Sequence, residues 1–134
     1  FIVKGIMTPE DAKLALEAGA DAIVVSNHGG RVLDHTPGTA EVLPNIAAEM
    51  KGKLGIIVDG GIRTGADVLK MLALGADAVM IGRPFSIAAM GGLTEGVTAF
   101  IASLRTELMQ AMVMTGTKSI EKISPSILYQ GQKA

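Results

Sequence analysis

The stretch GADAIVVSNHGGR, residues 19–31, joins a short apolar run to a polar loop that contains two glycines. An unbroken apolar run such as residues 22–25 is typical of a strand whose two faces are both buried in a parallel sheet. The first four letters, GADA, return at residues 75–78, again in front of an apolar run. The sequence therefore predicts two equivalent strands, each entered through the same turn and each part of a β-α unit.

The repeat covers a whole unit when the chain is compared with itself at an offset of 56 residues, the distance from Gly19 to Gly75. The identical pairs are Gly5/Gly61, Ile6/Ile62, Thr8/Thr64, Asp11/Asp67, Leu16/Leu72 and residues 19–22 with 75–78. Two copies of a βαβα unit give four strands, which is half of an eight-stranded barrel. Shared βα-turn chemistry in an open doubly wound sheet could produce the same repeat and is the alternative.

Periodicity and turn residues predict the other elements. Strands are expected at residues 1–4, 22–25, 56–59 and 78–81, and helices at 9–18, 40–50, 65–74, 97–114 and 117–122. Pro44, inside the second helix, predicts a delayed or kinked start. We therefore expect an α/β fold, the C-terminal half of a TIM (β/α)8 barrel with four βα units and C-terminal helices over residues 1–128. Residues 129–134 are expected to be a disordered tail.

Composition excludes several classes of function. The 134 residues carry 12 basic and 13 acidic side chains, which gives no electrostatic footprint for nucleic acid. No run approaches the roughly 18 apolar residues of a bilayer span, so no membrane partner is expected. The absence of cysteine excludes disulfides and a cysteine nucleophile, and we expect a cytoplasmic location. The chain begins in mid-strand and is about half as long as the roughly 250 residues of a complete barrel, which we interpret as half of an enzyme.

Polar residues follow each of the four predicted strands. Lys4 ends the first strand, residues 26–31 follow the second, residues 59–63 end the third, and residues 82–84 follow the fourth. The carboxyl ends of parallel strands lie at one face of a barrel, where barrel enzymes have their active sites. We therefore expect these segments to meet at one rim, with Asp59 as the candidate ion-pair partner of Lys4.

The segments after the third and fourth strands predict an anion site. Gly60, Gly61 and Gly82 allow backbone N–H groups to approach a phosphate, and a helix N-terminus behind them would add a favourable dipole. Arg63 and Arg83 offer planar forks for phosphate oxygens. The alternative is that the glycines only make tight turns and that the arginines pair with surface acids. The occurrence of the same combination after two adjacent strands favours phosphate.

The loop after the second strand carries a possible acid–base and substrate pair. His28 could take a proton, and Arg31, three residues later, could hold a carboxylate through two hydrogen bonds. The alternative is that His28 is structural, which is also what we expect for His35, farther along the loop. Asp34 is expected to order the loop or to pair with Arg31.

These segments together resemble the FMN-dependent α-hydroxy acid dehydrogenase/oxidase family, which includes glycolate oxidase and lactate oxidase. The resemblance rests on Lys4-Gly5, the stretch 19–31, Leu33-Asp34, the stretch Asp59-Gly60-Gly61-Ile62-Arg63, and Gly82-Arg83-Pro84. SNHGGR is its most specific part, and the two glycine–arginine elements also occur in other flavin barrels. The resemblance covers residues 1–128 but only the C-terminal half of the family's barrel.

The resemblance implies FMN as cofactor and a small 2-hydroxy acid as substrate. It implies that His28 is the catalytic base and that Arg31 binds the substrate carboxylate. It also implies that Lys4 and Ser26 contact the flavin ring system, and that Asp59, Gly60, Gly61, Arg63, Gly82 and Arg83 hold the ribityl chain and phosphate. The parent enzyme is expected to be a homotetramer.

Two departures from the family bear on this interpretation. Val32 stands where the family usually has Gln. The family's first half, which supplies tyrosines near the substrate carboxylate and an Asp partner for the His, has no counterpart here. We therefore expect the chain alone to be inactive and to self-associate through exposed sheet edges. The alternatives are another FMN- or phosphate-binding barrel enzyme, such as a type 2 isopentenyl-diphosphate isomerase, and a non-catalytic half-barrel.

Overall fold

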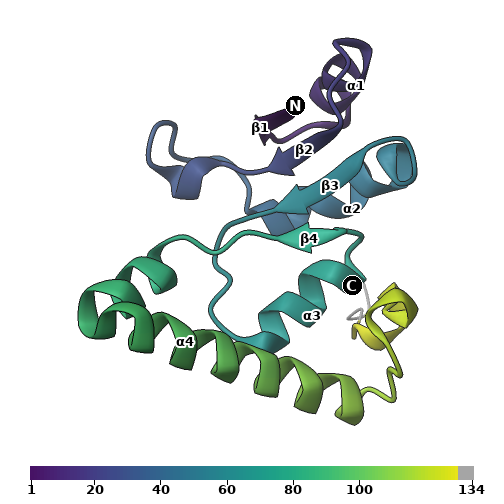
Figure 1. Ribbon diagram of the computed structural model, residues 1–134. Coiled ribbons are helices and arrows are strands. Elements are labelled where there is room, and N and C mark those ends of the chain that lie inside the picture. Colours follow the sequence, from purple (N-terminus) through teal and green to yellow (C-terminus); the bar gives the residue numbers. More distant parts are fainter. Residues whose placement is uncertain (130–134) are drawn as a thin grey trace.

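Each strand of the structure is followed by a helix, and the four strands lie side by side in the order β1-β2-β3-β4 (Figure 1). The computed structural model describes residues 1–129. Its strands are β1 (Ile2–Ile6), β2 (Ala22–Val25), β3 (Gly55–Val58) and β4 (Ala78–Val79). Its α-helices are α1 (Pro9–Glu17), α2 (Thr39–Met50), α3 (Gly65–Ala73) and α4 (Arg83–Met114), and its 3-10 turns are η1 (His28–Gly30), η2 (Ile120–Lys122) and η3 (Pro125–Ile127).

All three strand pairings are parallel, as the α/β prediction requires. Ile2 pairs with Ala22, which in turn pairs with Gly55, so the first three strands begin level with one another. Level strands bring the loops that follow them to one edge of the sheet. A register shift between Lys4 and Ile6 in β1 interrupts this pattern once.

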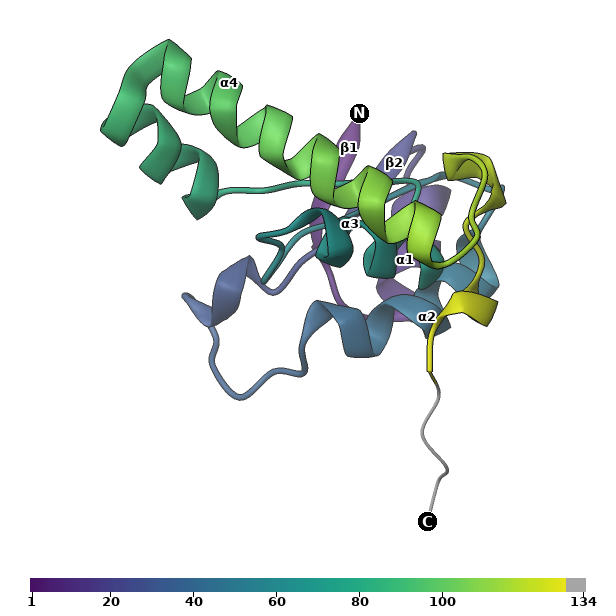
Figure 2. The same ribbon diagram turned by 90° about the horizontal axis from the view of Figure 1, so that it is seen from below.

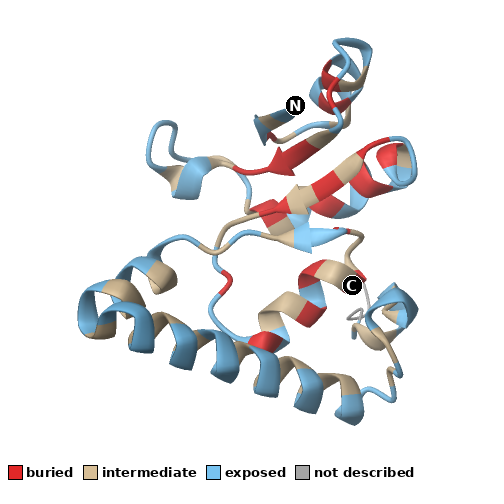
Figure 3. Ribbon diagram, in the orientation of Figure 1, coloured by how far each residue is buried: buried red, intermediate tan, exposed pale blue. Residues whose placement is uncertain are grey.

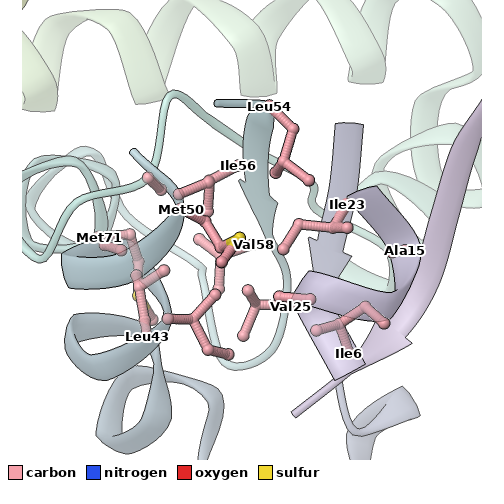
Figure 4. Packing of buried hydrophobic residues seen from close by; sticks show 14 of the residues in the cluster. Ile6, Ala15, Ile23, Val25, Leu43, Met50, Leu54, Ile56, Val58 and Met71 are labelled. Atoms are coloured by element: carbon pink, nitrogen blue, oxygen red, sulfur yellow. The ribbon is translucent and has the colours of Figure 1, made fainter. Parts of the chain in front are cut away.

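The core lies between the sheet and its helices. Every second strand residue faces the helices, and Ile23, Val25, Ile56 and Val58 are each 0% exposed. Figure 4 shows them packed against side chains from the helices, among them Ala15, Leu43, Met50 and Met71. Full burial of a large aliphatic side chain contributes about 1.5–3 kcal/mol, so this layer is the main stabilising contact of the domain.

The opposite face of the sheet is only partly covered, contrary to the prediction that both faces of every strand are buried. Ile2 is 57% exposed, Ile57 is intermediate and Ala78 is exposed, although Val24 is buried (Figure 3). Within residues 1–129 no second layer of helices packs on this face.

The first three helices begin close to where the sequence predicts. Thr8 accepts a hydrogen bond from the Asp11 amide at the start of α1, and Thr64 does the same for the Asp67 amide at α3. The prediction that Pro44 delays or kinks the start of α2 is wrong, since α2 begins at Thr39 without a break. The Glu41 carboxylate supports this start, because it accepts a hydrogen bond of 3.0 Å from the Gly38 amide.

Helix α4 differs most from the prediction, because it begins at Arg83 directly after a β4 of two residues rather than at residue 97. It consists of two arms, separated by non-helical angles at Gly92 (φ −152°) and Leu93 (φ 47°). The first arm folds back on the second (Figure 1), with the rings of Phe85 and Phe100 edge to face at 4.9 Å. Glycines on both sides of the break hide the helical period of the first arm from sequence analysis.

The second arm of α4 lies along α3 (Figure 2). A Cβ on Gly65 would stand 2.1 Å from the Leu108 amide nitrogen, so glycine is required for this close approach. Helix α4 is also long and apolar enough to cross a membrane by length and composition, with a mean hydropathy of 1.4 over its most apolar window and none of that window buried. The prediction from the sequence concerned unbroken apolar runs, whereas α4 reaches the level of a membrane span by its average hydropathy. The break at Gly92–Leu93 and the packing on α3 favour a helix that folds against the domain.

The C-terminal region follows the prediction in part. The expected helix at 117–122 is the single 3-10 turn η2. Tyr129 is 93% exposed, and the rest of the predicted tail, residues 130–134, lies outside the described residues.

Candidate functional site

Lys4 and the segments that follow β2, β3 and β4 meet at the carboxyl end of the sheet and line a cleft of about 540 Å³. Lys4 does not end its strand as predicted, because β1 continues to Ile6. Every predicted site residue lines this cleft except Ser26: Lys4, His28, Arg31, Asp59, Gly60, Gly61, Arg63, Gly82 and Arg83. The loop after β2 and the first arm of α4 reach toward the same side in Figure 1. A Cβ on Gly29 would lie 3.9 Å from an Arg83 guanidinium nitrogen, which places the two segments in contact. The predicted convergence on one rim is confirmed.

Lys4 and Asp59 form the ion pair expected from the sequence. Lys4 Nζ lies 3.3 Å from Asp59 Oδ2 and donates a hydrogen bond of 2.8 Å to Ser26 Oγ. The Lys4 side chain is 40% exposed and the Asp59 side chain 19%. The ammonium is thus fixed by two partners while part of it still faces the cleft.

Ser26 lies beneath the cleft and is 1% exposed. Its hydroxyl oxygen accepts hydrogen bonds from Lys4 Nζ and from the His28 amide, the latter at 3.1 Å. Ser26 therefore joins the Lys4 side chain to the first turn of the His28 loop. Its contact with a flavin ring stays a prediction.

His28 begins a left-handed turn. His28, Gly29 and Gly30 have φ values of 55°, 67° and 69° in succession. A non-glycine residue in this region costs roughly 1–2 kcal/mol, a strain that is typical of functional positions. The imidazole is exposed and has no hydrogen-bond partner within residues 1–129, so it can accept a proton from a bound molecule. His35 also has a positive φ, of 62°, but does not line the cleft.

Arg31 shares the cleft with His28, and its guanidinium is not used by an acidic partner. Asp34 instead accepts a hydrogen bond of 2.9 Å from the amide of its neighbour His35, so the alternative pairing with Arg31 is not made. Its role in ordering the loop stays a prediction. Among residues 1–129, the ion pairs involve lysines or the N-terminus and no arginine. The alternative that the arginines only pair with surface acids is therefore not seen in this structure.

The N-terminus of α3 is already occupied by carboxylates, contrary to its predicted role behind an anion site. Asp67 Oδ2 accepts hydrogen bonds from the Arg63 amide at 3.1 Å and the Thr64 amide at 3.0 Å, and Glu107 Oε2 accepts one from the Gly65 amide at 2.7 Å. Burial raises the pKa of Asp67, but the hydrogen bonds from Thr64 and the Arg63 amide lower it below its ordinary value overall. This end of α3 is therefore neutralised within the chain.

Helix α4 provides the helix N-terminus that can bind an anion. Its N-cap is Gly82, which makes no side-chain capping bond, and Arg83 is its first residue. A Cβ on Gly82 or Gly61 would meet no atom within 4 Å, so both backbones border open space. Pro84 has no N–H, and the Phe85 and Ser86 amides donate to the Gly82 carbonyl oxygen at 3.0 and 3.3 Å. The Gly82 and Arg83 amides, with guanidinium groups nearby, are therefore the groups suited to a phosphate.

Asp59 Oδ1 adds a second requirement on any ligand. It is the buried side-chain oxygen that lacks a hydrogen-bond partner among the described residues. Leaving such an acceptor unsatisfied costs about 1–3 kcal/mol, so a hydroxyl donor is expected to occupy this position. A phosphate ester that also carries hydroxyl groups fits these donors and acceptors, and FMN, with its ribityl chain and phosphate, is such a molecule.

Sequence analysis missed two residues that hold the site together. Thr39 is 3% exposed and its hydroxyl donates a hydrogen bond of 2.6 Å to the Asp59 carbonyl oxygen. The predicted helix began one residue later, and a threonine directly before a helical pattern could have been recognised as its first residue. Asn27, within the quoted motif, caps the Gly29 amide at 2.9 Å.

A second cleft, of about 600 Å³, lies on the other side of Gly60 and Gly61, between the loop after β2 and α3. Asn27, Asp34, Thr36 and Lys70 are among the residues that line it. Residues 1–129 contain no group of three His, Cys, Asp or Glu side chains that could hold a metal ion.

Comparisons with known proteins agree with this geometry. A family model described as "FMN-dependent dehydrogenase" matches residues 1–130. The 2-hydroxyacid oxidase of Dictyostelium discoideum is 52% identical over 133 residues, which cover 99% of this chain and 34% of that protein. The L-lactate dehydrogenase of Pseudomonas paraeruginosa is 51% identical over 128 residues, which cover 96% of this chain and 34% of that protein.

Solved structures give the same result. A mandelate oxidase with benzoyl-formic acid superposes with a TM-score of 0.87 at 46% identity, covering 90% of this chain and 36% of that one. A mandelate oxidase variant with the monooxide FMN adduct also gives a TM-score of 0.87 at 46% identity, covering 90% of this chain and 38% of that one. The chain therefore spans about a third of the length of the relatives it matches, which agrees with the fold of a partial barrel.

Proposed function

Because this chain belongs to the FMN-dependent dehydrogenase family, we propose that it forms the main cofactor- and substrate-binding part of an enzyme that oxidises a small 2-hydroxy acid to the 2-oxo acid. One observation supports this more than any other. His28, Arg31 and Lys4 line one cleft together with the glycine and arginine residues suited to a phosphate. A base, a carboxylate anchor and a cofactor site are the parts this oxidation needs.

The cofactor would be held by backbone, guanidinium and carboxylate groups of the cleft. The Gly82–Arg83 backbone at the start of α4 and the guanidinium groups of Arg63 and Arg83 would bind the FMN phosphate, and Asp59 Oδ1 would accept a hydrogen bond from a ribityl hydroxyl. When bound, FMN supplies the acceptor for the two electrons that leave the substrate. Lys4 would place a positive charge beside it, with its position fixed by Asp59 and Ser26.

The substrate would be bound and activated from the loop after β2. Arg31 would bind the substrate carboxylate with two parallel N–H···O bonds. His28 would accept a proton from the bound 2-hydroxy acid, and its exposed imidazole can reach the cleft without breaking a bond within residues 1–129. The left-handed turn at residues 28–30 keeps the two side chains on the same cleft.

The substrate side chain is the finer part of the proposal. The relatives carry the names 2-hydroxyacid oxidase, L-lactate dehydrogenase and mandelate oxidase, which supports L-lactate as the first substrate to test and glycolate as the second. We further propose that the whole enzyme is a cytoplasmic homotetramer, which size-exclusion chromatography and cell fractionation would test.

A chimera tests the catalytic proposal directly. The chain would replace the matching third of the D. discoideum 2-hydroxyacid oxidase, to which it is 52% identical over 133 residues. The chimera should bind FMN, and its flavin absorbance should bleach when L-lactate or glycolate is added without oxygen. A chimera that folds and binds FMN but turns over no 2-hydroxy acid would overturn the proposal.

The isolated chain provides the complementary experiment. Its β1 and β4 edges have no strand partner within residues 1–129, and Ile2 beside one of them is 57% exposed. We expect the 134-residue chain to show no oxidation of 2-hydroxy acids with added FMN and to elute from gel filtration as a dimer or larger species. Turnover by the isolated chain would show that these residues suffice.

A further inference from the structure

The side chain of Asn27 ties the two ends of the loop after β2 together. Its Oδ1 accepts a hydrogen bond of 2.9 Å from the Gly29 amide. Its Nδ2 donates to the Pro37 carbonyl oxygen at 3.2 Å and to Thr36 Oγ1 at 3.4 Å. One amide group thus contacts both the turn that contains His28 and the far end of the segment that contains Arg31.

Between these points the loop buries little apolar surface. Val32 is 84% exposed and Leu33 is 69% exposed, so neither contributes a buried apolar contact. The second cleft, of about 600 Å³, lies behind the loop and separates it from α3. A segment with few packing contacts depends on its hydrogen bonds for its position.

The left-handed turn also needs support from outside itself. Gly29 and Gly30 adopt a positive φ readily, but the same conformation is disfavoured for an L-amino acid such as His28. Such strain persists only where neighbouring contacts impose it. The bond from the Gly29 amide to Asn27 Oδ1 is such a contact, because it closes the turn directly over His28.

We infer that Asn27 is a positioning residue that sets His28 and Arg31 through the hydrogen bonds of its two amide atoms. Oδ1 fixes the turn that begins at His28 and is capped by Arg31, whose amide donates to the His28 carbonyl oxygen at 3.4 Å, and Nδ2 fixes the returning end of the loop. This inference rests on the proposed function for the roles of His28 and Arg31. It assigns a task to a residue that lines the second cleft and not the cleft of His28 and Arg31.

Two substitutions separate the bond to Oδ1 from the two bonds of Nδ2. Asn27→Asp keeps an oxygen for the Gly29 amide but loses the donor and places a carboxylate oxygen against the Pro37 carbonyl. Asn27→Ala loses all three bonds. Asn45→Asp makes the same chemical change on an exposed position of α2 and is the matched control.

Steady-state kinetics in the FMN-loaded chimera should distinguish the two variants. For Asn27→Asp we expect kcat and KM for the 2-hydroxy acid to stay within about threefold, since the bond that fixes the turn is kept. For Asn27→Ala we expect kcat to fall and KM to rise about tenfold each, because the imidazole and the guanidinium both lose their position. Asn45→Asp should change neither constant.

Amide hydrogen exchange on the full 134-residue chain gives a readout that does not depend on turnover. The Gly29 amide should be protected in the unchanged chain and in Asn27→Asp, and should lose its protection in Asn27→Ala. If the unchanged chimera oxidises no 2-hydroxy acid, the proposed function fails, and the exchange pattern still decides the role of Asn27. Equal kinetic losses in both variants, or Gly29 protection that survives in Asn27→Ala, would overturn the inference.

Discussion

Each β-α unit of the repeat contributes to both ends of the sheet, and the two ends differ in how many of their polar groups have a partner within the chain. At the amino end, Asp77 accepts a hydrogen bond of 2.9 Å from the Ile56 amide and one of 2.6 Å from Lys51. At the carboxyl end, Asp59 has an unpaired oxygen and the arginines have no acidic partner within residues 1–129.

This difference separates the part of the chain that stabilises the fold from the part that binds ligands. A buried polar group without a partner lowers stability, so it is kept where a ligand supplies the partner. The amino end has its partners within the chain. Changes there should alter the free energy of unfolding, whereas changes at the carboxyl end should alter binding and turnover.

The largest effect is expected for His28→Gln. In the chimera, loss of the proposed base should lower kcat by roughly 10²- to 10⁴-fold. The melting temperature should not change, because the imidazole is exposed. His35→Gln is the matched control, since His35 lies in the same loop, also has a positive φ of 62° and does not line the cleft. Similar losses in both variants would break the contrast between the ends.

The next effect concerns the anion site. Arg83→Gln should raise the dissociation constant of FMN by about 10- to 100-fold, the value of a charge-assisted hydrogen bond. Arg105→Gln, on an exposed position of the same helix, should leave it unchanged. Flavin fluorescence titration measures the dissociation constant of FMN for the two variants. Equal affinities would show that the start of α4 does not hold the phosphate.

The hydrogen bond from Thr39 lies at the carboxyl end of the sheet, so it tests whether this end also contributes to stability. Thr39→Val removes the hydrogen bond to the Asp59 carbonyl and should lower the free energy of unfolding by about 1 kcal/mol. Thr39→Ser keeps the hydroxyl and should restore most of the loss. Urea unfolding of the three proteins gives the comparison. A serine variant as unstable as the valine variant would assign the effect to packing instead.

The smallest effect is a pH dependence at the amino end. Burial raises the pKa of Asp77, but the hydrogen bonds from Lys51 and the Ile56 amide and the Lys51 charge lower it below its ordinary value overall. Its contribution is therefore present above the unfolded pKa of about 4 and is lost as the pH falls through the lower folded value. The stability difference between the unchanged protein and Asp77→Asn should shrink below that pH in urea titrations. A difference that stays constant would show that the pair adds no acid-dependent stability.

Sequence analysis identified the strands and the residues of the rim because both follow local rules. The apolar runs, the repeated GADA turn and the caps Thr8 and Thr64 are each encoded within a few residues. Apart from the Lys4–Asp59 ion pair, which the convergence of the strand ends predicted, contacts across the chain were not accessible in that way. The bond from Lys4 to Ser26 spans 22 residues, and the Glu107 carboxylate that occupies the start of α3 lies 42 residues from Gly65. The first arm of α4 was missed because its glycines and Pro84 weaken the helical pattern, and its packing on the second arm outweighs that local preference.

The contact of Gly65 with the α4 backbone has a kinetic consequence. Since no side chain separates the two helices at Gly65 and Glu107 bonds across them, α3 and the second arm of α4 should move as one rigid unit on the microsecond timescale of domain motions. The phosphate-binding wall begins the first arm, which packs on this unit through Phe85 and Phe100, whereas the substrate-binding wall is a loop that hydrogen bonds hold at its two ends. A ligand on the rigid wall would dissociate slowly, and one on the loop would exchange rapidly. The same cleft could then retain a cofactor through many turnovers while it releases a product after each one.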